Sequence, residues 1–343
     1  MAAVESVAQC VALRVPDELP VFCHSERFDA AYCRLPYQRY ASEAAALVDC
    51  QVHTVRRFDW DWSWVHVDDA LELEPFGVTT SLEDDEPRHI LTHLPLTRAT
   101  LNSLRPATAL TGDRLGVLLG SLSRLRAIFG DSKCICGRLS GPLTLVTLLF
   151  GPAAVETARQ NNPTLLRDAI EFALEVDLLL LEAQASAGAH ALWIDDRLAC
   201  SDVLPPSEYT TLLLAPTRRL LNAARSEEVW GFYHTAENDA DALAIHAQAE
   251  PDVLSLGPSL PLPQAHAAVG QQVALMGNLD PTILLTRAWP SQVAAYVDGL
   301  VRYMKTGGMI LSTAGPVPPD ARGPNLHIVV DTARKIWDIV GGR

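Results

Sequence analysis

The sequence contains none of the short glycine-rich motifs that mark nucleotide-binding loops. Neither G-x-G-x-x-G nor the Walker pattern occurs, and no G-x-S-x-G elbow signals a serine hydrolase. Internal repeats and low-complexity tracts are missing as well. These absences argue against dinucleotide-binding and P-loop proteins and favour folds that need no such loop.

Positive charge is scarce in this chain. Its 343 residues include 27 Lys and Arg against 41 Asp and Glu, which gives a formal net charge of −14. A chain this acidic, without basic clusters, is poorly suited to binding nucleic acid or an anionic membrane surface. We therefore expect neither of them as a partner.

Long hydrophobic runs and a disulfide pattern are also lacking. The most apolar run, 178–181, lies between Asp177 and Glu182 and is far too short to cross a membrane. Residues 1–14 show no signal-peptide pattern. The seven cysteines are odd in number and follow no disulfide spacing. We therefore expect reduced thiols in a cytoplasmic protein.

What the sequence does contain is an alternation of strand-like and helix-like segments. Strands are expected at 62–67, 134–137, 189–194, 229–233, 253–256, 273–276 and 309–312, and helices at 43–58, 114–129, 162–187, 207–224, 239–249, 264–268, 290–305 and 325–340. An eighth strand would come from 79–96 or from an unassigned segment before Cys134. This rhythm predicts one α/β domain over 1–343, a (β/α)8 TIM barrel, with 1–41 as an irregular N-terminal extension.

The stretch 62–69 is the most informative segment for placing an active site. Aromatic and β-branched residues form a strand that ends in Asp68 and Asp69, and a helix-like segment follows until Gly77. One of the two acids is well placed to cap that helix. The other then faces a cavity, and Asp68 is the one that we assign to chemistry.

In a barrel of this kind the carboxyl ends of the strands meet at one mouth, where the active site lies. The residues at these ends are His66, Asp68, Asp69, Arg138, Ser140, Asp195, Asp196, His234, Asn278, Asp280, Ser312 and Thr313. Acids, histidine and arginine together offer general acid–base catalysis and an anion contact. Structural roles stay open for several of them. Asp195 or Asp196 could cap a turn, Asn278 and Asp280 could form one, and His234 could be a wall residue.

Cysteine spacing gives little support for a metal site. Cys134 and Cys136 lie two apart on an expected strand and therefore on one face. They could form half of a zinc site, but no second pair matches them, and two buried thiols are the simpler interpretation.

Several motifs in order resemble the uroporphyrinogen decarboxylase superfamily. They are 138–145 (RLSGPLTL), 277–281 (GNLDP), 308–312 (GMILS), 317–320 (VPPD) and 325–326 (NL), and the resemblance spans about 34–334. It implies a (β/α)8 barrel, and either tetrapyrrole decarboxylation or zinc-dependent methyl transfer between corrinoid proteins and thiols. The stretch 195–209 is more similar to the methyltransferase branch.

The chain departs from the decarboxylase pattern. Asp68 falls where that pattern has an acid that holds the pyrrole nitrogens, but Leu148 and Gly315 occupy the positions of its tyrosine and histidine. Arg34 and Arg39 lie near its paired arginines with a different spacing. The resemblance therefore does not favour uroporphyrinogen as the substrate.

The zinc ligands of the methyltransferase branch are not kept either. His234 matches the first ligand, whereas Ala236 and Gly315 stand at or near the two cysteine positions. Zinc usually takes three protein ligands in a catalytic site, so we expect no zinc here.

We accordingly predict an enzyme of this superfamily that transfers a one-carbon (methyl) group without the usual zinc site. Asp68 and His234 are the expected catalytic pair, and the expected substrate contacts are His66, Arg138, Asp195, Asn278 and Asp280. The expected substrate is a small molecule. A corrinoid or folate would carry the methyl group, and a corrinoid protein is the possible partner. A homodimer is also possible. The alternatives are a decarboxylase of uroporphyrinogen or another acid, and an inactive barrel that binds a ligand.

Overall fold

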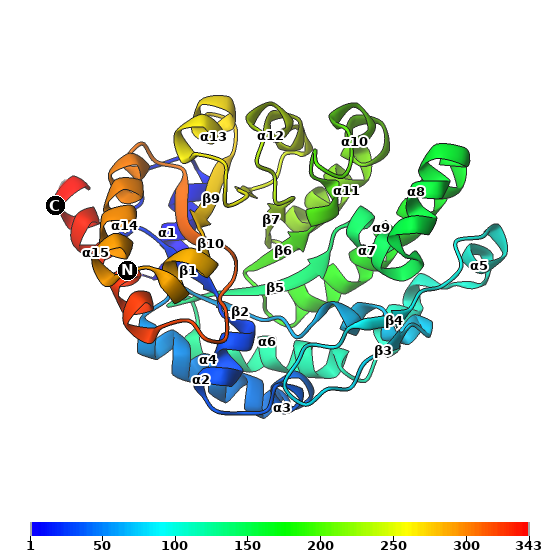
Figure 1. Ribbon diagram of the computed structural model, residues 1–343, viewed down its shortest axis with the longest axis horizontal. Helices are drawn as coiled ribbons and strands as arrows, with labels where there is room; N and C mark the ends of the chain where they lie inside the picture. Colours follow the sequence, from blue (N-terminus) through cyan, green and yellow to red (C-terminus); the bar gives the residue numbers. More distant parts are fainter. Residues whose placement is uncertain (1, 342–343) are drawn as a thin grey trace.

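Eight parallel strands form the centre of the protein in the computed structural model, which describes residues 2–341. They are β1 (Val21–His24), β2 (Trp62–Trp64), β5 (Cys134–Ser140), β6 (Ala191–Asp195), β7 (Trp230–His234), β8 (Val253–Ser255), β9 (Ala274–Leu279) and β10 (Met309–Pro316). Their order is β1-β10-β9-β8-β7-β6-β5-β2, with helices around them (Figure 1). The predicted (β/α)8 barrel is confirmed.

The helices follow the strands along the chain, as the sequence rhythm predicts. The α-helices are α1 (Ala3–Val11), α2 (Glu26–Tyr32), α3 (Tyr37–Ser42), α4 (Ala44–Phe58), α5 (Arg98–Ser103), α6 (Leu115–Phe129), α7 (Pro142–Phe150), α8 (Pro152–Asn161), α9 (Pro163–Ser186), α10 (Pro206–Leu212), α11 (Leu214–Ser226), α12 (Ala240–His246), α13 (Leu262–Val269), α14 (Pro290–Met304) and α15 (Gly323–Val340). Short helices are η1 (Asp69–Glu72), η2 (Glu74–Phe76), η3 (Pro106–Thr111), η4 (Arg197–Ala199), η5 (Ala247–Ala249) and η6 (Ile283–Arg287). Within the described residues, none of the helices has the length and apolar character that a membrane span requires.

The N-terminal segment is part of the barrel, and the prediction of an irregular extension over 1–41 was wrong. It contributes α1, the first barrel strand β1, and the helices α2 and α3. The missing eighth strand is therefore Val21–His24, and it does not come from 79–96. A four-residue strand directly after Pro20 is too short to produce a readable alternation of apolar and polar residues.

Backbone and side-chain hydrogen bonds close the barrel at the seam between β1 and β2. The backbone N–H of Asp61 donates to the carbonyl of Val21 at 3.0 Å, and the Val21 N–H donates to the Asp61 carboxylate at 2.8 Å. The Trp62 indole N–H donates to the carbonyl of Cys23 at 2.8 Å. Arg334 on α15 pairs with Asp61 at 2.7 Å, so the last helix is also fixed to this seam.

The barrel interior is packed below its mouth by alternate residues of the strands. The buried side chains that share this interior are Phe22, Trp62, Trp64, Cys134, Cys136, Ala191, Trp193, Phe232, Val253, Ala274, Met276 and Ile310. Val7 and Cys10 of α1 join the same cluster, so α1 plugs the N-terminal end of the barrel. The two cysteines of β5 are buried core residues, and burial raises the pKa of both thiols.

A hairpin arm between β2 and α6 projects from the mouth end. It contains β3 (Thr79–Thr80) and β4 (Ile90–Thr92), which pair antiparallel and stand apart from the barrel sheet (Figure 1). The residues between these strands reach back to the body, where the Gln38 N–H donates to the carbonyl of Asp84 at 3.0 Å. The arm therefore forms one wall of the mouth.

Candidate active site at the barrel mouth

A cavity of about 510 Å³ opens at the carboxyl ends of the strands. Its lining residues are His24, Glu26, Arg27, Trp64, His66, Asp68, Asp69, Pro87, Arg88, His89, Arg138, Trp193, Asp195, Arg197, His234, Gly315, Pro316, Val317, Pro318 and Pro319. Five of the seven residues that the sequence assigned to the site line it, namely His66, Asp68, Arg138, Asp195 and His234. The mouth of a (β/α)8 barrel is where such a fold places its chemistry.

Asp68 and Asp69 separate into the two roles that the sequence left open. Asp68 caps η1 by accepting from the Ala70 N–H at 3.1 Å, and Arg114 donates to its two carboxylate oxygens at 2.7 and 2.9 Å. Asp69, which also lines the cavity, pairs with Arg138 at 2.7 Å and contacts Arg197. These contacts favour a structural role for Asp68, and its catalytic assignment stays a prediction.

Two arginines and two acids form a charge-balanced cluster on one wall of the cavity. Arg138 reaches inward from β5 and donates to Asp69 at 2.7 Å and to Asp195 at 2.8 Å. Arg197, from the turn after β6, contacts the same two carboxylates. Burial alone would raise the pKa of Asp195, but Arg197 and Arg138 lower it strongly. Burial likewise opposes the ionisation of Asp69, and the same arginines lower its pKa overall.

Glu72 lies behind this cluster and supports it. Its carboxylate accepts from the backbone N–H of Ser140 at 3.0 Å and lies 3.7 Å from Arg138. The side chain of Arg138 is only 2% exposed. With its guanidinium bound to acids on all these sides, Arg138 has little capacity left for the substrate anion that the sequence assigned to it.

Four histidines line the cavity, and burial holds three of them, His24, His66 and His234, neutral. Burial lowers the pKa of His66 to about 3, with Arg138 adding to the effect, and it lowers the pKa of His234 to about 4. The His24 pKa also lies well below its usual value because the ring is buried. His234 stacks on Trp193 at 4.8 Å and contacts the Ser255 hydroxyl at 3.1 Å. These rings can accept or donate a hydrogen bond without adding charge.

Glu26 is a cavity residue whose pKa lies near neutral pH, and the sequence analysis did not identify this residue as part of the site. Burial raises the pKa of this carboxyl to about 8, and the nearby Asp68 and Asp69 add to the effect. The Tyr37 hydroxyl donates to its Oε1 at 2.7 Å, and its Oε2 lies 3.9 Å from Nε2 of His66. Glu26 is therefore mostly protonated at neutral pH and can exchange a proton near that pH.

The two remaining residues of the predicted site lie elsewhere. Asn278 donates to the carbonyls of Gly257 and Leu260 at 2.9 and 2.6 Å, so it holds the loop after β8. Asp280 accepts from the Ile283 N–H at 3.0 Å, as a turn former does. Among residues 2–341, neither belongs to the lining of the mouth cavity. Local hydrogen bonds take up these side chains, and their assignment as substrate contacts stays a prediction that the structure does not support.

The arginines near the decarboxylase pair are also outside the mouth. Arg39 pairs with Glu43 on the surface at 3.0 Å, and Arg34 faces a neighbouring groove. The cations that do line the mouth are Arg27, Arg88, Arg138 and Arg197. Arg138 was predicted from the sequence, whereas the positions of Arg27 after β1, Arg88 in the hairpin arm and Arg197 after β6 are not evident from sequence spacing alone.

A zinc ion of the methyltransferase type does not fit the residues present. His234 faces the cavity, but Ala236 and Gly315 carry no donor atom, and within residues 2–341 no three His, Cys, Asp or Glu side chains are arranged to hold a metal. The His234 ring stacks on Trp193, and His24 contacts the same Trp193 ring. No step of the chemistry below is therefore assigned to zinc.

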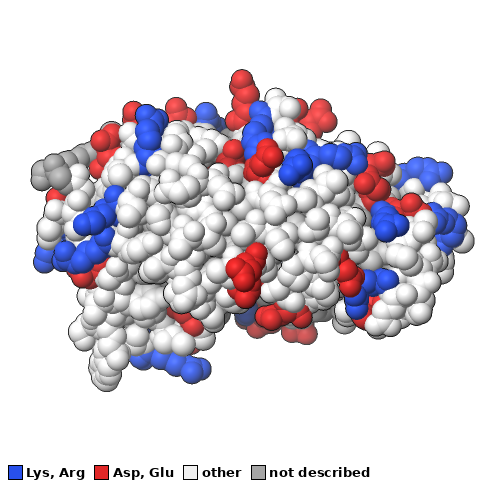
Figure 2. Space-filling model, turned by 90° about the horizontal axis from the view of Figure 1, so that it is seen from above, with Lys and Arg blue, Asp and Glu red and all other residues white. Residues whose placement is uncertain are grey.

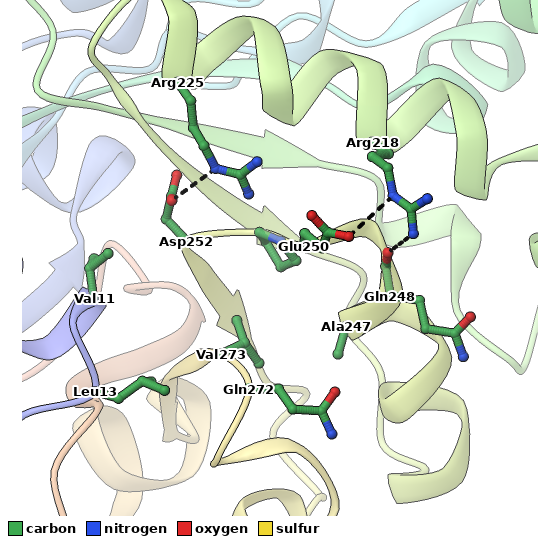
Figure 3. Close-up of a pocket in the computed structure, with 11 residues that line it drawn as sticks. Val11, Leu13, Arg218, Arg225, Ala247, Gln248, Glu250, Asp252, Gln272 and Val273 are labelled. Carbon is green, nitrogen blue, oxygen red and sulfur yellow. Dashed lines mark hydrogen bonds and ion pairs between the residues drawn. The ribbon is translucent and has the colours of Figure 1, made fainter.

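A second hollow, of about 480 Å³, lies at the opposite end of the barrel, beside the starts of β8 and β9 (Figure 3). Its cations are Arg218 and Arg225 of α11, which pair with Glu250 at 3.7 Å and with Asp252 at 3.4 Å. Along the outer surface in Figure 2, cationic and acidic side chains are likewise interspersed around a largely uncharged centre. This hollow contains no histidine and none of the strand-end residues.

The fold is a (β/α)8 barrel whose mouth is lined by acids, histidines and arginines. The model of the family described as "Uroporphyrinogen decarboxylase (URO-D)" matches residues 5–336, and the chain belongs to this family. It is similar to the methylcobamide:CoM methyltransferase MtbA of Methanosarcina acetivorans, at 22% identity over 93% of both chains. It is also similar to uroporphyrinogen decarboxylase of Rhizorhabdus wittichii, at 27% identity over 72% of this chain and 71% of that one. A solved methyltransferase structure from Methanosarcina mazei has the same fold, with a TM-score of 0.87, 16% identity, and coverage of 98% and 100%.

Proposed function

We propose that the protein transfers a one-carbon unit to or from a small molecule at the barrel mouth, by proton transfer and without zinc. The observation that carries this proposal is the Glu26 carboxyl, which lines the cavity and has a pKa of about 8. A proton donor or acceptor with a pKa near the working pH is the most effective kind. His66, with Nε2 at 3.9 Å from Glu26, lies beside this carboxyl as a neutral ring that could hydrogen-bond the substrate.

Methyl transfer is the first candidate reaction, supported by the similarity to MtbA along 93% of the chain. In it, ionised Glu26 removes a proton from the N–H, O–H or S–H group of the acceptor. The freed electron pair then attacks the methyl carbon, and the donor leaves with the pair of the broken bond. The donor would be a methylated corrinoid, with a corrinoid protein as the partner, or a methylated folate.

Removal of a carboxyl group is the second candidate, because Glu26 is mostly protonated at neutral pH. The carbanion left by loss of CO2 would take its proton from Glu26. The similarity to uroporphyrinogen decarboxylases is compatible with this chemistry. We expect a substrate smaller than uroporphyrinogen, since Arg138 is already bound to Asp69 and Asp195.

The remaining mouth residues have supporting roles in both reactions. The cluster of Arg138, Arg197, Asp69 and Asp195 keeps the strand ends in place and supplies fixed charges next to the substrate. Neutral His234, supported by Ser255, would contact the substrate with the face of Trp193 behind it. Asp68 acts indirectly, because its pairing with Arg114 positions Asp69.

The pH dependence of turnover separates the two candidates. Methyl transfer from methylcobalamin, used as the probe donor, to thiols and amines is followed by absorbance, and CO2 release is measured from a panel of small carboxylic acids. If Glu26 is the base, kcat/KM rises through about 8; if it is the acid, kcat/KM falls there. Glu26→Gln should remove that limb and lower kcat by roughly 10²-fold or more.

The control for this experiment is Gln248→Ala at the far end of the barrel, which leaves the mouth unchanged. Unaltered turnover in Glu26→Gln would refute the proposal. Ligand binding with no turnover of either kind would instead identify a barrel that only binds its ligand.

A further inference from the structure

Arg27 stands between the mouth and a neighbouring groove. The groove measures about 520 Å³, and its walls include Arg27, Arg34, Leu35, Pro36, Glu86 and Pro319. Arg27 and Pro319 also line the mouth cavity. A ligand seated in the mouth would therefore meet the guanidinium of Arg27 before it reached the groove.

A single acid from the hairpin arm holds Arg27 in place. Its guanidinium lies 2.7 Å from Glu86, and the two side chains are 32% and 41% exposed. An ion pair as exposed as this contributes little to stability, since water screens both charges. An anion of a ligand could take the place of Glu86 at small cost.

Other cations of the mouth are held more firmly. Arg138 is almost fully buried and binds two acids, and Arg197 contacts the same two. Arg88 pairs with Glu74 at 2.6 Å, and Glu74 is itself held by Arg114 at 3.0 Å. Arg27 is thus the mouth cation whose partner is most readily exchanged.

The hairpin arm would stay in place during such an exchange. Gln38 donates from its backbone N–H to the carbonyl of Asp84 at 3.0 Å, and from its side chain to the carbonyl of Glu86 at 2.9 Å. Both bonds involve the backbone of the arm and leave the Glu86 carboxylate out. Release of Arg27 therefore requires one side chain to rotate and no rearrangement of the arm.

We propose that Arg27 recognises an anionic group of the substrate, a carboxylate or a phosphate, and that Glu86 occupies its place in the free protein. The rest of such a molecule extends along Leu35, Pro36 and Pro319 toward Arg34, which forms no ion pair within residues 2–341. The ligand class is a small acid long enough to reach from the mouth into the groove. The identification of this acid as substrate rests on the proposed function, whereas its binding does not.

Calorimetric titration of the full chain with succinate and with inorganic phosphate, at constant ionic strength, tests this site without any turnover. Glu86→Gln frees Arg27 and should tighten binding by roughly two- to fivefold, which corresponds to an exposed ion pair. Glu83→Gln is the matched control, since it removes the same charge from the exposed arm outside both cavities, and it should bind as the unmodified protein does.

Arg27→Gln should weaken binding by about tenfold or more, as expected for a lost charge-assisted hydrogen bond. Arg57→Gln, on the exposed face of α4, is its control and should have no effect. Circular dichroism verifies that each variant is folded. A response to succinate alone identifies a carboxylate site, and a response to phosphate alone identifies a phosphate site.

Equal binding by Glu86→Gln and Glu83→Gln would overturn the proposal, as would full binding by Arg27→Gln. Binding of neither probe by Glu86→Gln would overturn it as well. None of these outcomes depends on Glu26, so a failure here is distinguishable from a failure of the proposed chemistry.

Discussion

The two ends of the barrel both contain arginines and acids, but they use them differently. At the mouth, Arg138 is buried among Asp69, Asp195 and Glu72, and burial shifts the pKa of His24, His66, His234 and Glu26. At the opposite end, the hollow of Figure 3 holds Arg218 and Arg225 in longer, half-exposed pairs. Arginines and acids occur at both ends. The difference in burial therefore explains why the pKa values are shifted at the mouth.

The arrangement of secondary structure explains why the ion pairs are buried at the mouth and exposed at the other end. The mouth receives the inward side chains of several strands plus the hairpin arm, so its charges lie within a packed wall. The other end is plugged by α1, and its charges sit on α11 and on the loop before β8. Interactions at the mouth should therefore be costly to remove, whereas those at the far end should not.

The largest expected effect comes from removing the central cation of the mouth. Arg138→Met leaves buried carboxylates without their main partner, and we expect a loss of about 3–5 kcal/mol in the free energy of unfolding. Arg225→Met at the far end removes an exposed pair with Asp252 and should cost below about 1 kcal/mol. Urea unfolding of both variants measures the difference, and equal losses would contradict the comparison.

Asp68→Asn should have the next largest effect, and it decides between the two roles of this residue. Asn still caps η1, but it loses the ion pair with buried Arg114, so we expect stability to fall by about 2 kcal/mol. Turnover of the folded fraction should change only a few-fold. A loss of roughly 10²-fold in rate at unchanged stability would instead restore Asp68 as the general base.

The stability of the protein should depend on pH through Glu26. Its pKa rises from an ordinary value of 4.5 in the unfolded chain to about 8 in the folded one, so folding takes up a proton between these values. The contribution of Glu26 to the free energy of unfolding therefore falls as pH rises through this window, by up to about 1.4 kcal/mol per pH unit.

Asp29 and Asp196, whose pKa values burial raises to about 7, act in the same direction. Glu26→Gln should flatten the dependence, and Gln248→Ala at the far end should not, as measured by urea unfolding in a series of buffers. An unchanged slope in Glu26→Gln would show that this carboxyl is ionised in the folded protein.

The smallest expected effect concerns zinc. Because Ala236 and Gly315 offer no ligand beside His234, we expect substoichiometric zinc in protein purified without chelator and no change on His234→Ala. Elemental analysis measures both. Stoichiometric zinc that is lost on His234→Ala would contradict this prediction and would bring back the zinc-dependent methyl-transfer mechanism.

Sequence reasoning located much of the mouth because strands have a period of two. Cys134, Cys136 and Arg138 share one side of β5, and His234 closes an aromatic strand, so their inward direction follows from alternation alone. Asn278 also ends a strand, but its side chain bonds to the neighbouring loop. Alternation predicts toward which side of the sheet a side chain points. It does not predict which polar side chains hydrogen-bond to a neighbouring loop.

Glu26 and Arg27 escaped notice for a different reason. They follow β1, a short strand in a proline-punctuated segment that shows no period, and Pro36 nearby supports an irregular interpretation. The raised pKa of Glu26 depends on Asp68 and Asp69, some forty positions further along the chain, in addition to burial. Only the closed barrel brings these acids together, so one sequence could not have revealed this carboxyl.

The central claim is that the mouth holds a protonated carboxyl at Glu26, and infrared difference spectroscopy tests it without a known substrate. The carbonyl band of a protonated carboxyl is recorded over a pH series for the unmodified protein and for Glu26→Gln. We predict that the difference between the two contains a carboxyl band that disappears with a midpoint of about 8. A band that disappears below about 5, or no difference between the two proteins, would contradict the account.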